Sequence, residues 1–493
     1  MGRNLLTFIF AMGFGLVLNA QWVSPGNGTT YTPENLVEVA DGCVTFDTIS
    51  MTYLIVEDIT ISANDKLYVN ANDTQAGLRF AGPDLTLTIK GAMEAVGMDT
   101  VTPLVIGQAG DLRCRIRFED ATGPSTLDRC CFSAFSGIQI INSKVAFEHC
   151  TFSGMDTYHQ TAAVTCMHCD PVFTHCGFSG NQGAGISSPA NGHSSPQLLH
   201  CLFTNNVTAN TNHPQVNLGP GSEDTIRIVN CTIEGGGHDQ SGGISITDLM
   251  GVGNTTILLK DNVVRNNRYG YNQQGNNLSS VIVGNAFLDN NLETNPMMGG
   301  SGISIYGTDE NNKAFMRGNI ITGNLWGITA INAFDINLGT MDDWGNNQIQ
   351  DNGNNGGIYD LYNNSAYGIA AIGNQWGSTD ENEVEHHIFH QHDDPALGLV
   401  SYVPFIGYEN TGAAETRHFT LSPNPIIQGR FTLKMEEAIP SEMAIYNTKG
   451  QLVKSQYIDN QLNIINIGNL VSGIYFVEVR NEQWKTVTKI MVE

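Results

Sequence analysis

Apolar and polar residues alternate in short stretches through most of the chain, with the period of β-strands. Ile244-Ser245-Ile246 and Ile303-Ser304-Ile305 are examples in which every second residue is apolar. Such alternation is typical of strands with one buried face, and turns rich in Asn and Gly separate the stretches. The sequence therefore predicts an all-β fold made of many short strands.

A tripeptide that begins with Cys or Asn and ends with an apolar residue repeats ten times, 20 to 34 residues apart. Its first residues are Cys130, Cys150, Cys176, Cys201, Cys231, Asn262, Asn285, Asn319, Asn347 and Asn374. A Gly-Ile pair marks a further strand start between many of them, beginning at Gly137, Gly185, Gly243, Gly302, Gly327 and Gly357.

Repeats of this length with several short strands each predict a parallel β-helix, a solenoid whose stacked coils bury one continuous core. Equivalent residues of successive coils then form columns, so the ten Cys and Asn positions are expected to form a ladder of packed thiols and hydrogen-bonded amides. Residues 30–118 alternate in the same way and are expected to form the first coils. The competing repeat fold is a β-propeller, whose blades of about 40–50 residues are longer than these repeats.

Two stretches resemble the ends of pectin-lyase-like right-handed parallel β-helix proteins. Asp58-Ile59-Thr60-Ile61 and Thr102-Pro103-Leu104 are similar to the opening coils, and Asn374-Gln375-Trp376-Gly377 and Asp393-Asp394-Pro395 to the closing cap. The resemblance implies a right-handed solenoid over most of residues 30–410. It specifies the fold more than the activity.

The C-terminal segment, residues 419–493, resembles the type A sorting domain of type IX secretion. The motif positions include Pro423, Asn424, Pro425, Gly450, Gly473 and Tyr475. The resemblance implies a small β-sandwich, engagement with the type IX machinery, passage across the outer membrane and a Bacteroidota-type source. The expected domains are a signal peptide (1–20), an N-terminal cap with the first coils (21–128), the β-helix with its closing cap (129–410), a linker (411–418) and the sorting domain (419–493).

Residues 1–20 have a basic start at Arg3, an apolar middle and the small residue Ala20, which predicts a secretory signal. The alternative is an N-terminal membrane anchor, although the apolar run is short for a bilayer span. No other stretch approaches spanning length, so a secreted or surface-anchored chain without a transmembrane segment is expected.

The chain is acidic, with 48 Asp and Glu against 23 Lys and Arg and a net charge of −25. The excess lies before residue 415. Such a surface repels nucleic acid and is compatible with calcium binding, but the sequence makes no cofactor evident.

An exported chain with ten cysteines suggests disulfides. Side chains stacked on neighbouring strands are, however, about 4.8 Å apart, farther than the Cβ atoms of a disulfide. The ladder therefore predicts mostly free, buried thiols.

Candidate catalytic residues are His238 and Asp239, which half match a Gly-His-Gly motif, and the carboxylate pair Asp342 and Asp343. Paired carboxylates can act as acid and base on a glycoside. Their polygalacturonase-type companions Asn-x-Asp and Arg-x-Lys do not occur in the chain, so solvated turns are the competing interpretation. Candidate metal ligands are His386 and His390, which could share a helix face; the alternative is a cap segment that seals the last coil.

The connection from each Cys or Asn strand to the next strand start varies in length, which is often a sign of a binding edge in solenoids. It contains the loops 155–159, 210–213, 237–239 and 292–295, and tolerated loop drift is the alternative explanation. The favoured hypothesis is a non-catalytic surface protein that binds a polysaccharide or a cell-surface ligand or acts as an adhesive rod. The alternative is a polysaccharide lyase or glycoside hydrolase, which rests on fold analogy alone.

Overall fold

The computed structural model describes residues 21–71, 77–100, 102–108, 113–251, 253–307, 311–408, 419–427, 429–468, 470–481 and 484–493. The predicted signal peptide and linker lie outside these residues. The chain forms two compact units, Met1–Tyr408 and Glu409–Glu493.

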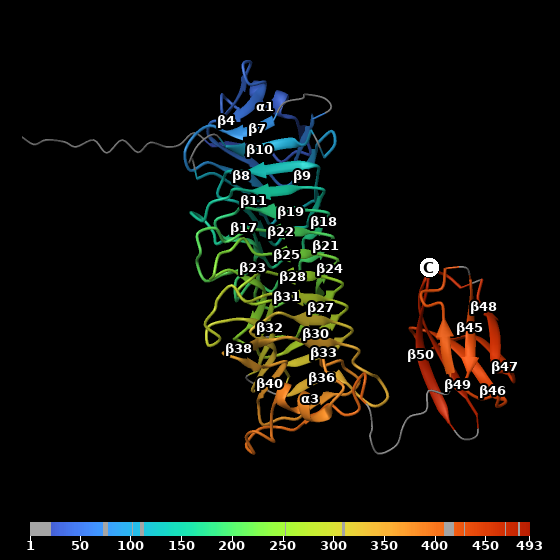
Figure 1. Ribbon diagram of the computed structural model, residues 1–493. Coiled ribbons are helices and arrows are strands. Elements are labelled where there is room, and N and C mark those ends of the chain that lie inside the picture. The colour runs from blue at the N-terminus through green and yellow to red at the C-terminus, as the bar shows by residue number, and fades with distance from the viewer. Residues whose placement is uncertain are drawn as a thin grey trace, which may run out of the picture. The chain divides into compact units, whose positions relative to one another are not determined.

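The first unit is a stack of coils, and each regular coil adds one strand to each of three long sheets (Figure 1). Sheet 1 contains β1 (Gln21–Val23), β5 (Asp58–Ile61), β8 (Thr86–Ile89), β11 (Arg115–Glu119), β14 (Ile138–Ile141), β17 (Ala162–Met167), β20 (Ala184–Ser187), β23 (Pro214–Leu218), β26 (Gly242–Asp248), β29 (Tyr271–Gly275), β32 (Ser301–Gly307), β35 (Trp326–Ile331), β40 (Leu361–Asn364) and β42 (Ile388–Phe389).

Sheet 2 contains β2 (Thr30–Tyr31), β6 (Lys66–Asn70), β9 (Ala92–Val96), β12 (Ser125–Asp128), β15 (Val145–Glu148), β18 (Val172–Thr174), β21 (Gln197–Leu199), β24 (Thr225–Val229), β27 (Thr255–Lys260), β30 (Leu278–Val283), β33 (Lys313–Arg317), β36 (Asp335–Gly339), β41 (Ile369–Ala371) and β43 (Val400–Ser401).

Sheet 3 contains β3 (Val44–Asp47), β4 (Thr52–Ile55), β7 (Gly77–Phe80), β10 (Leu104–Gln108), β13 (Cys130–Ser133), β16 (Thr151–Ser153), β19 (Gly177–Ser179), β22 (Leu202–Thr204), β25 (Thr232–Glu234), β28 (Val263–Arg265), β31 (Ala286–Leu288), β34 (Ile320–Thr322) and β37 (Gln348–Gln350). All strand pairs of the three sheets are parallel except the opening pair β3–β4. The structure thus confirms the predicted parallel β-helix.

The core consists of inward side chains that stack on their equivalents in the next coil. Along sheet 3, the rings of Phe132, Phe152, Phe178 and Phe203 stack in order, with centroids 5.1, 4.6 and 4.4 Å apart. These distances are close to the spacing of hydrogen-bonded strands, so the backbone bonds and the ring contacts are satisfied together.

A one-residue turn connects most sheet 2 strands to the following sheet 3 strand. Its residue has a left-handed backbone, with φ of 53° at Arg129, 50° at His149, 54° at His175 and 57° at His200. In later coils Asn230, Asp261, Gly284, Gly318, Asn346 and Gly373 have the same sign of φ. Because the chain turns at a single residue, the following residue of the tripeptide repeat points into the core.

The Gly-Ile starts at 137, 185, 243, 302 and 327 lie in the sheet 1 column, whereas the expectation for Gly357-Ile358 is wrong. Gly357 and Ile358 form β39 (Gly357–Ile358), which pairs with β38 (Gly353–Asn354) in a small antiparallel hairpin. Leu361 takes the sheet 1 position opposite Ile328 instead. The hairpin is an insertion, which local sequence similarity did not distinguish from a strand of the coil.

Both ends of the solenoid are covered. Helix α1 (Pro33–Val39) begins at a capping box on Thr32 and buries Leu36 at the N-terminal end. At the other end, helix α3 (Glu381–His387) and the buried side chains of Trp376 and Phe405 close the core. These covers shield the apolar ends that a stack of coils otherwise exposes.

The second unit is an antiparallel β-sandwich. One sheet contains β44 (Phe419–Ser422), β45 (Arg430–Met435) and β48 (Leu462–Asn466), and the other contains β46 (Ser441–Asn447), β47 (Leu452–Ile458), β49 (Gly473–Arg480) and β50 (Lys485–Val492). Phe431, Ile445 and Val477 are among the side chains of its common core. Within the described part of the chain, no helix has the length and apolar character needed to cross a membrane.

Candidate ligand-binding face

The ten predicted ladder residues lie in one buried column at the turn from sheet 2 to sheet 3. In its asparagine half, each Nδ2 donates to the Oδ1 of the next asparagine in the column. The donor–acceptor distances are 2.8 Å for Asn262–Asn285, 3.0 Å for Asn285–Asn319, and 2.8 Å for both Asn319–Asn347 and Asn347–Asn374. The cysteine half continues the column, and the backbone N–H of Cys231 donates to Asn262 Oδ1. All ten cysteines of the chain are free thiols, and all except Cys131 are buried.

A second buried amide column, which the sequence analysis missed, lies at the turn from sheet 3 to sheet 1. Its donor–acceptor chain runs through Asn181, Asn206, Gln215, Asn267, Asn290, Asn324 and Asn352 and ends on the carboxylate of Asp360. The asparagines stand five residues after positions of the first ladder, a spacing that was available in the sequence. At Gly236 the pattern is interrupted, and Gln215 from sheet 1 supplies the missing amide.

Asp360 ends this column without exposure to solvent. One carboxylate oxygen accepts from Asn352, and the other lies 3.1 Å from His387 Nδ1. Burial raises the pKa of Asp360, although the hydrogen bonds to it act in the opposite direction. The contact with the Asp360 carboxylate raises the pKa of His387. The two side chains form the end of the ladder.

The structure does not bring the four catalytic candidates together. His238 and Asp239 lie on the connection from sheet 3 to sheet 1, where His238 Nε2 is 3.1 Å from Asn205 Oδ1 and Asp239 accepts from Asn210. Asp342 and Asp343 lie on the connection from sheet 2 to sheet 3, and Asp343 pairs with Arg317 at 2.7 Å. The two pairs lie on different edges of the solenoid, with sheet 3 between them, so they form no common acid–base site.

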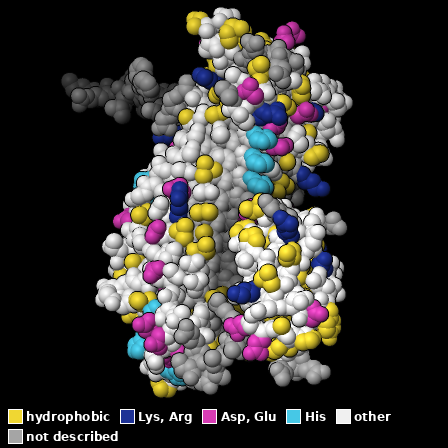
Figure 2. Space-filling view, turned by 45° about the vertical axis from the view of Figure 1, so that its right-hand side comes forward, with side chains coloured by type: hydrophobic (Ala, Val, Ile, Leu, Met, Phe, Trp, Pro, Cys, Tyr) yellow, Lys and Arg dark blue, Asp and Glu magenta, His cyan; other side chains and the backbone are white. Residues whose placement is uncertain are grey.

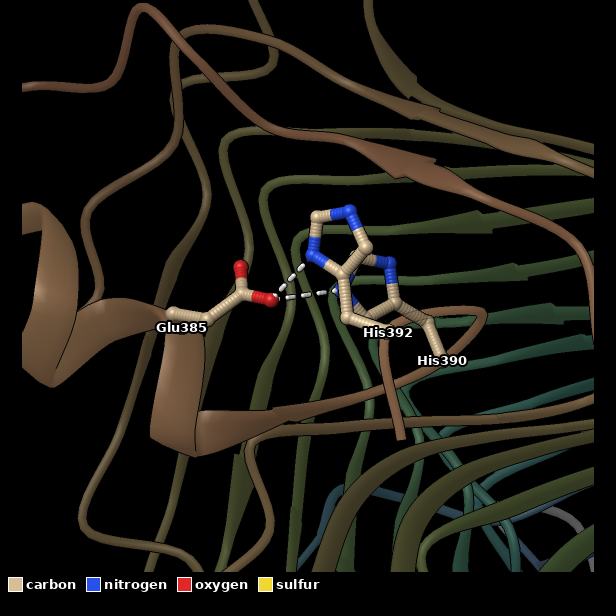
Figure 3. A group of neighbouring side chains, drawn as sticks. All are labelled: Glu385, His390 and His392. Carbon is tan, nitrogen blue, oxygen red and sulfur yellow. Dashed lines mark hydrogen bonds and ion pairs between the residues drawn. The ribbon is translucent and has the colours of Figure 1, made fainter. Parts of the chain in front are cut away.

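The proposed helix face of His386 and His390 is also absent, because α3 ends at His387. His390 instead contacts Glu385, with 3.0 Å between His390 Nε2 and Glu385 Oε1, and His392 Nδ1 contacts the same oxygen at 2.5 Å (Figure 3). The backbone N–H of Val400 donates to His390 Nδ1, so the ring carries its proton on Nε2 and donates it to Glu385. Neither nitrogen of His390 has a free lone pair for a metal ion, and the arrangement is a hydrogen-bonded lock of the cap.

The cap lock predicts an acid-sensitive contribution to stability. Burial opposes the ionisation of Glu385, but hydrogen bonds from Tyr402, His390 and His392 outweigh it and lower its pKa from 4.5 to about 2. A carboxylate with a lower pKa in the folded state stabilises the fold above its unfolded pKa, and this contribution is lost as the pH falls towards the folded pKa. We therefore expect Glu385→Gln to flatten the decline of stability between pH 4.5 and 2, measured by urea unfolding. The exposed control Glu383→Gln should keep the wild-type slope, and an unchanged slope in Glu385→Gln would contradict the assignment.

The outward face of sheet 1 carries a column of uncharged polar side chains at one register position. Strand pairing places its members opposite one another in successive coils: Gln139, Thr165, Ser187, Asn217, Ser245, Asn272, Ser304 and Thr329. Neighbours also bond to each other, as in the 3.0 Å bond from Asn272 Nδ2 to Ser245 Oγ. We call these eight residues the polar column.

An aromatic cluster continues the polar column towards the C-terminal cap. Tyr362 is the next residue in register after Thr329, and Phe389 follows it. The Tyr362 and Phe389 rings stack at 4.8 Å, and Trp326 packs against Tyr362 at 5.0 Å and Tyr359 at 4.8 Å. All four side chains are half-buried. The four rings are therefore partly exposed at the C-terminal end of the polar column.

The loops before the sheet 1 strands form one rim of this face and bond from coil to coil. Asn210 Nδ2 donates to Asp239 Oδ1 at 2.7 Å, and Arg268 Nε donates to the carbonyl of Met298 at 2.8 Å. The indole N–H of Trp326 donates to the carbonyl of Pro296 at 2.9 Å. The variable loops thus hold the aromatic cluster in place.

The C-terminal residues 420–493 match the model of the secretion system C-terminal sorting domain, and residues 167–340 match that of the right handed beta helix region. The chain is a right-handed β-helix protein with a type IX sorting domain. The sorting domain directs this β-helix protein across the outer membrane to the cell surface or the extracellular space.

Two solved structures similar to the β-helix protein are a single and a double mutant of the periplasmic alginate epimerase AlgG. Each is 12% identical to it, and each match covers 76% of this chain and 83% of the other, with TM-scores of 0.41 and 0.32. No curated protein matches the chain.

The motif residues of the sorting domain have structural roles within the sandwich. Asn424, between Pro423 and Pro425, accepts from the backbone N–H of Met491 and donates to the carbonyl of Lys489. Gly450 has φ of 74° in the β46–β47 turn, where a side chain is disfavoured. Gly473 begins β49, and the Tyr475 hydroxyl donates to the carbonyl of Val471 at 2.9 Å.

Proposed function

We propose that the β-helix protein binds a neutral polysaccharide along the outward face of sheet 1, in a non-catalytic adhesive or glycan-binding role outside the cell. The observation that carries the proposal is the polar column, whose eight members are hydroxyls and amides at one position of successive coils. Such groups both donate and accept hydrogen bonds, as the hydroxyls of a sugar chain do. Five of the eight, Gln139, Thr165, Asn217, Asn272 and Ser304, are partly exposed and form the repeating row that a repeating ligand can contact, whereas Ser187, Ser245 and Thr329 are buried.

The aromatic cluster and the charge of the chain support the same ligand class. Tyr and Trp combine a large apolar face with a polar atom, which suits a sugar ring with an apolar C–H face and a hydroxyl edge. The net charge of −25 opposes the approach of an anionic polymer. A neutral polysaccharide meets neither repulsion nor an unpaired charge along the polar column.

The experiment uses the mature full-length chain in electrophoresis through gels that contain neutral or anionic polysaccharides, with and without calcium. We expect retardation by at least one neutral polysaccharide and none by the anionic ones. Failure of every neutral polysaccharide to retard the protein would contradict the proposal.

One observation supports an enzymatic alternative, a polysaccharide lyase or glycoside hydrolase. A depression of about 610 Å³ lined by Ile358, Glu383, His386 and His387, together with Gly357 and Asn382, lies between the chain segments that carry Tyr359 and Phe389. The same polysaccharides are therefore incubated with the protein and assayed for new reducing ends and unsaturated products. Product from any of them would replace the binding role by a catalytic one.

A further inference from the structure

A row of histidines lies on the opposite side of the coil from the polar column, at the one-residue turns between sheets 2 and 3. The rings of His149, His175 and His200 stack with centroids 5.1 and 4.9 Å apart and planes within 10°. Figure 2 shows histidine side chains one above another on the surface, with acidic and basic side chains beside one end of the row. The acidic side chains next to His149 are Asp128 and Glu148.

We propose that Asp128, Glu148 and His149 form a binding site for a divalent transition-metal ion of the zinc class. Asp128 Oδ1 lies 3.5 Å and Glu148 Oε1 3.8 Å from His149 Nδ1, and the three ligand atoms lie within 4.8 Å of one another. Ligands about 2.0–2.2 Å from a tetrahedral zinc ion are about 3.4 Å apart, so the three atoms need only a small adjustment to surround an ion.

The hydrogen bonding of the cluster is incomplete in a way that matches this role. Asp128 Oδ1 and His149 Nδ1 are both shielded from solvent and lack a hydrogen-bond partner. The other oxygen, Asp128 Oδ2, is held by Arg129 at 2.9 Å, which fixes the carboxylate with Oδ1 facing His149. Asp128 and Glu148 are also register partners on adjacent strands, where their like charges repel each other and a bound cation would reduce the repulsion.

The cluster at the C-terminal cap shows the contrast. Glu385, His390 and His392 also bring three ligand atoms together, but they are already joined by hydrogen bonds of 3.0 and 2.5 Å. A distance of 2.5 Å between ligand atoms leaves no room for an ion, whereas 3.5 and 3.8 Å do.

The imidazole ligand limits which metals fit the proposed site, and the stacking of the rings limits how many histidines can bind one ion. An imidazole nitrogen suits zinc, copper or nickel, whereas calcium requires six to eight oxygen ligands. The lone pairs of stacked rings lie in parallel planes and do not converge, so His175 and His200 do not add to the ligands of the same ion. The proposed site has three protein ligands and is open to solvent on the side of Glu148, which is exposed.

The test measures Zn²⁺ binding to the mature full-length chain by competition with a chromophoric chelator, and the change in Tm on adding Zn²⁺. The variant His149→Asn is well suited, because Asn adopts the left-handed backbone readily and stands at the same turn in Asn230 and Asn346. His200→Asn makes the same replacement in the same row without removing a ligand. Asp128→Asn removes the charge of a second ligand and keeps its shape.

We expect His149→Asn and Asp128→Asn to weaken Zn²⁺ binding at least about tenfold and to lose the Zn²⁺-dependent rise in Tm. His200→Asn should bind within about twofold of the wild type. Absence of Zn²⁺ binding by the wild type, equal weakening in His200→Asn, or displacement of Zn²⁺ by an equal concentration of Ca²⁺ would each overturn the proposal.

Discussion

Asn319→Ala is expected to lower the free energy of unfolding of the β-helix by roughly 2–6 kcal/mol, because it removes four hydrogen bonds of a buried amide, each worth about 0.5–1.5 kcal/mol. Asn319 Nδ2 donates to Ile282 O and Asn347 Oδ1, both at 2.8 Å. Its Oδ1 accepts from the backbone N–H and the Nδ2 of Asn285, at 2.9 and 3.0 Å. Calorimetry of the mature chain should show a lower Tm for the transition of the β-helix.

Asn319→Asp separates the loss of hydrogen bonding from the loss of packing, and Asn382→Ala is a surface control. Asn319→Asp keeps the size and an acceptor but cannot donate to Ile282 O, so we expect a loss of stability similar to that of the alanine variant. Asn382→Ala, on the exposed surface of α3, should change the free energy of unfolding by less than about 0.5 kcal/mol. If Asn319→Ala and Asn382→Ala have the same stability, the ladder does not stabilise the coils as argued.

Trp326→Ala is expected to weaken the binding of a neutral polysaccharide at least thirtyfold, which corresponds to about 2 kcal/mol, a typical effect for a central aromatic contact. The loss has two causes. The indole face is removed from the end of the polar column, and the bond that links Trp326 to Pro296 in the rim is removed with it. Retardation of the variant in the same polysaccharide gels gives the change in Kd.

Trp344→Ala is the matched control for this prediction. Trp344 is 41% exposed and lies in the loop between β36 and β37, on the connection from sheet 2 to sheet 3. If the ligand binds along sheet 1, Trp344→Ala should bind it with the same Kd as the wild type. Equal weakening by the two substitutions, or no weakening by Trp326→Ala, would place the ligand elsewhere.

The solenoid and its first ladder follow directly from the sequence, because each depends on a pattern within a single coil. The tripeptide repeat places Cys or Asn directly after a left-handed turn residue, and each of the ten coils of the repeat has that local geometry. The second ladder was harder to predict, because Gly236 interrupts it and Gln215, from a different part of the coil, completes it. When an amide from a distant position of the coil takes the place of a missing one, the spacing of residues along the sequence does not reveal it.

The candidate site was predicted less well, for a related reason. Local sequence indicates loops at His238 and Asp342 but does not show that these loops lie on different edges of the coil. The polar column was visible only as the middle residue of apolar-polar-apolar triplets such as Ile303-Ser304-Ile305, where the apolar residues define the strand. The column is recognised only when the register between coils is known. Insertions such as the β38–β39 hairpin change the spacing of its members along the sequence but leave their alignment in the structure unchanged.

The one-residue turn between sheets 2 and 3 has a consequence for how this chain can change in length. Since this corner contains a single left-handed residue in most coils, coils of 20 to 34 residues stay aligned by taking up their extra residues mostly at other corners. A whole coil can therefore be inserted or deleted between two such corners with every remaining strand still in register. Insertion or deletion at this corner would lengthen or shorten the proposed ligand-binding face by one coil at a time.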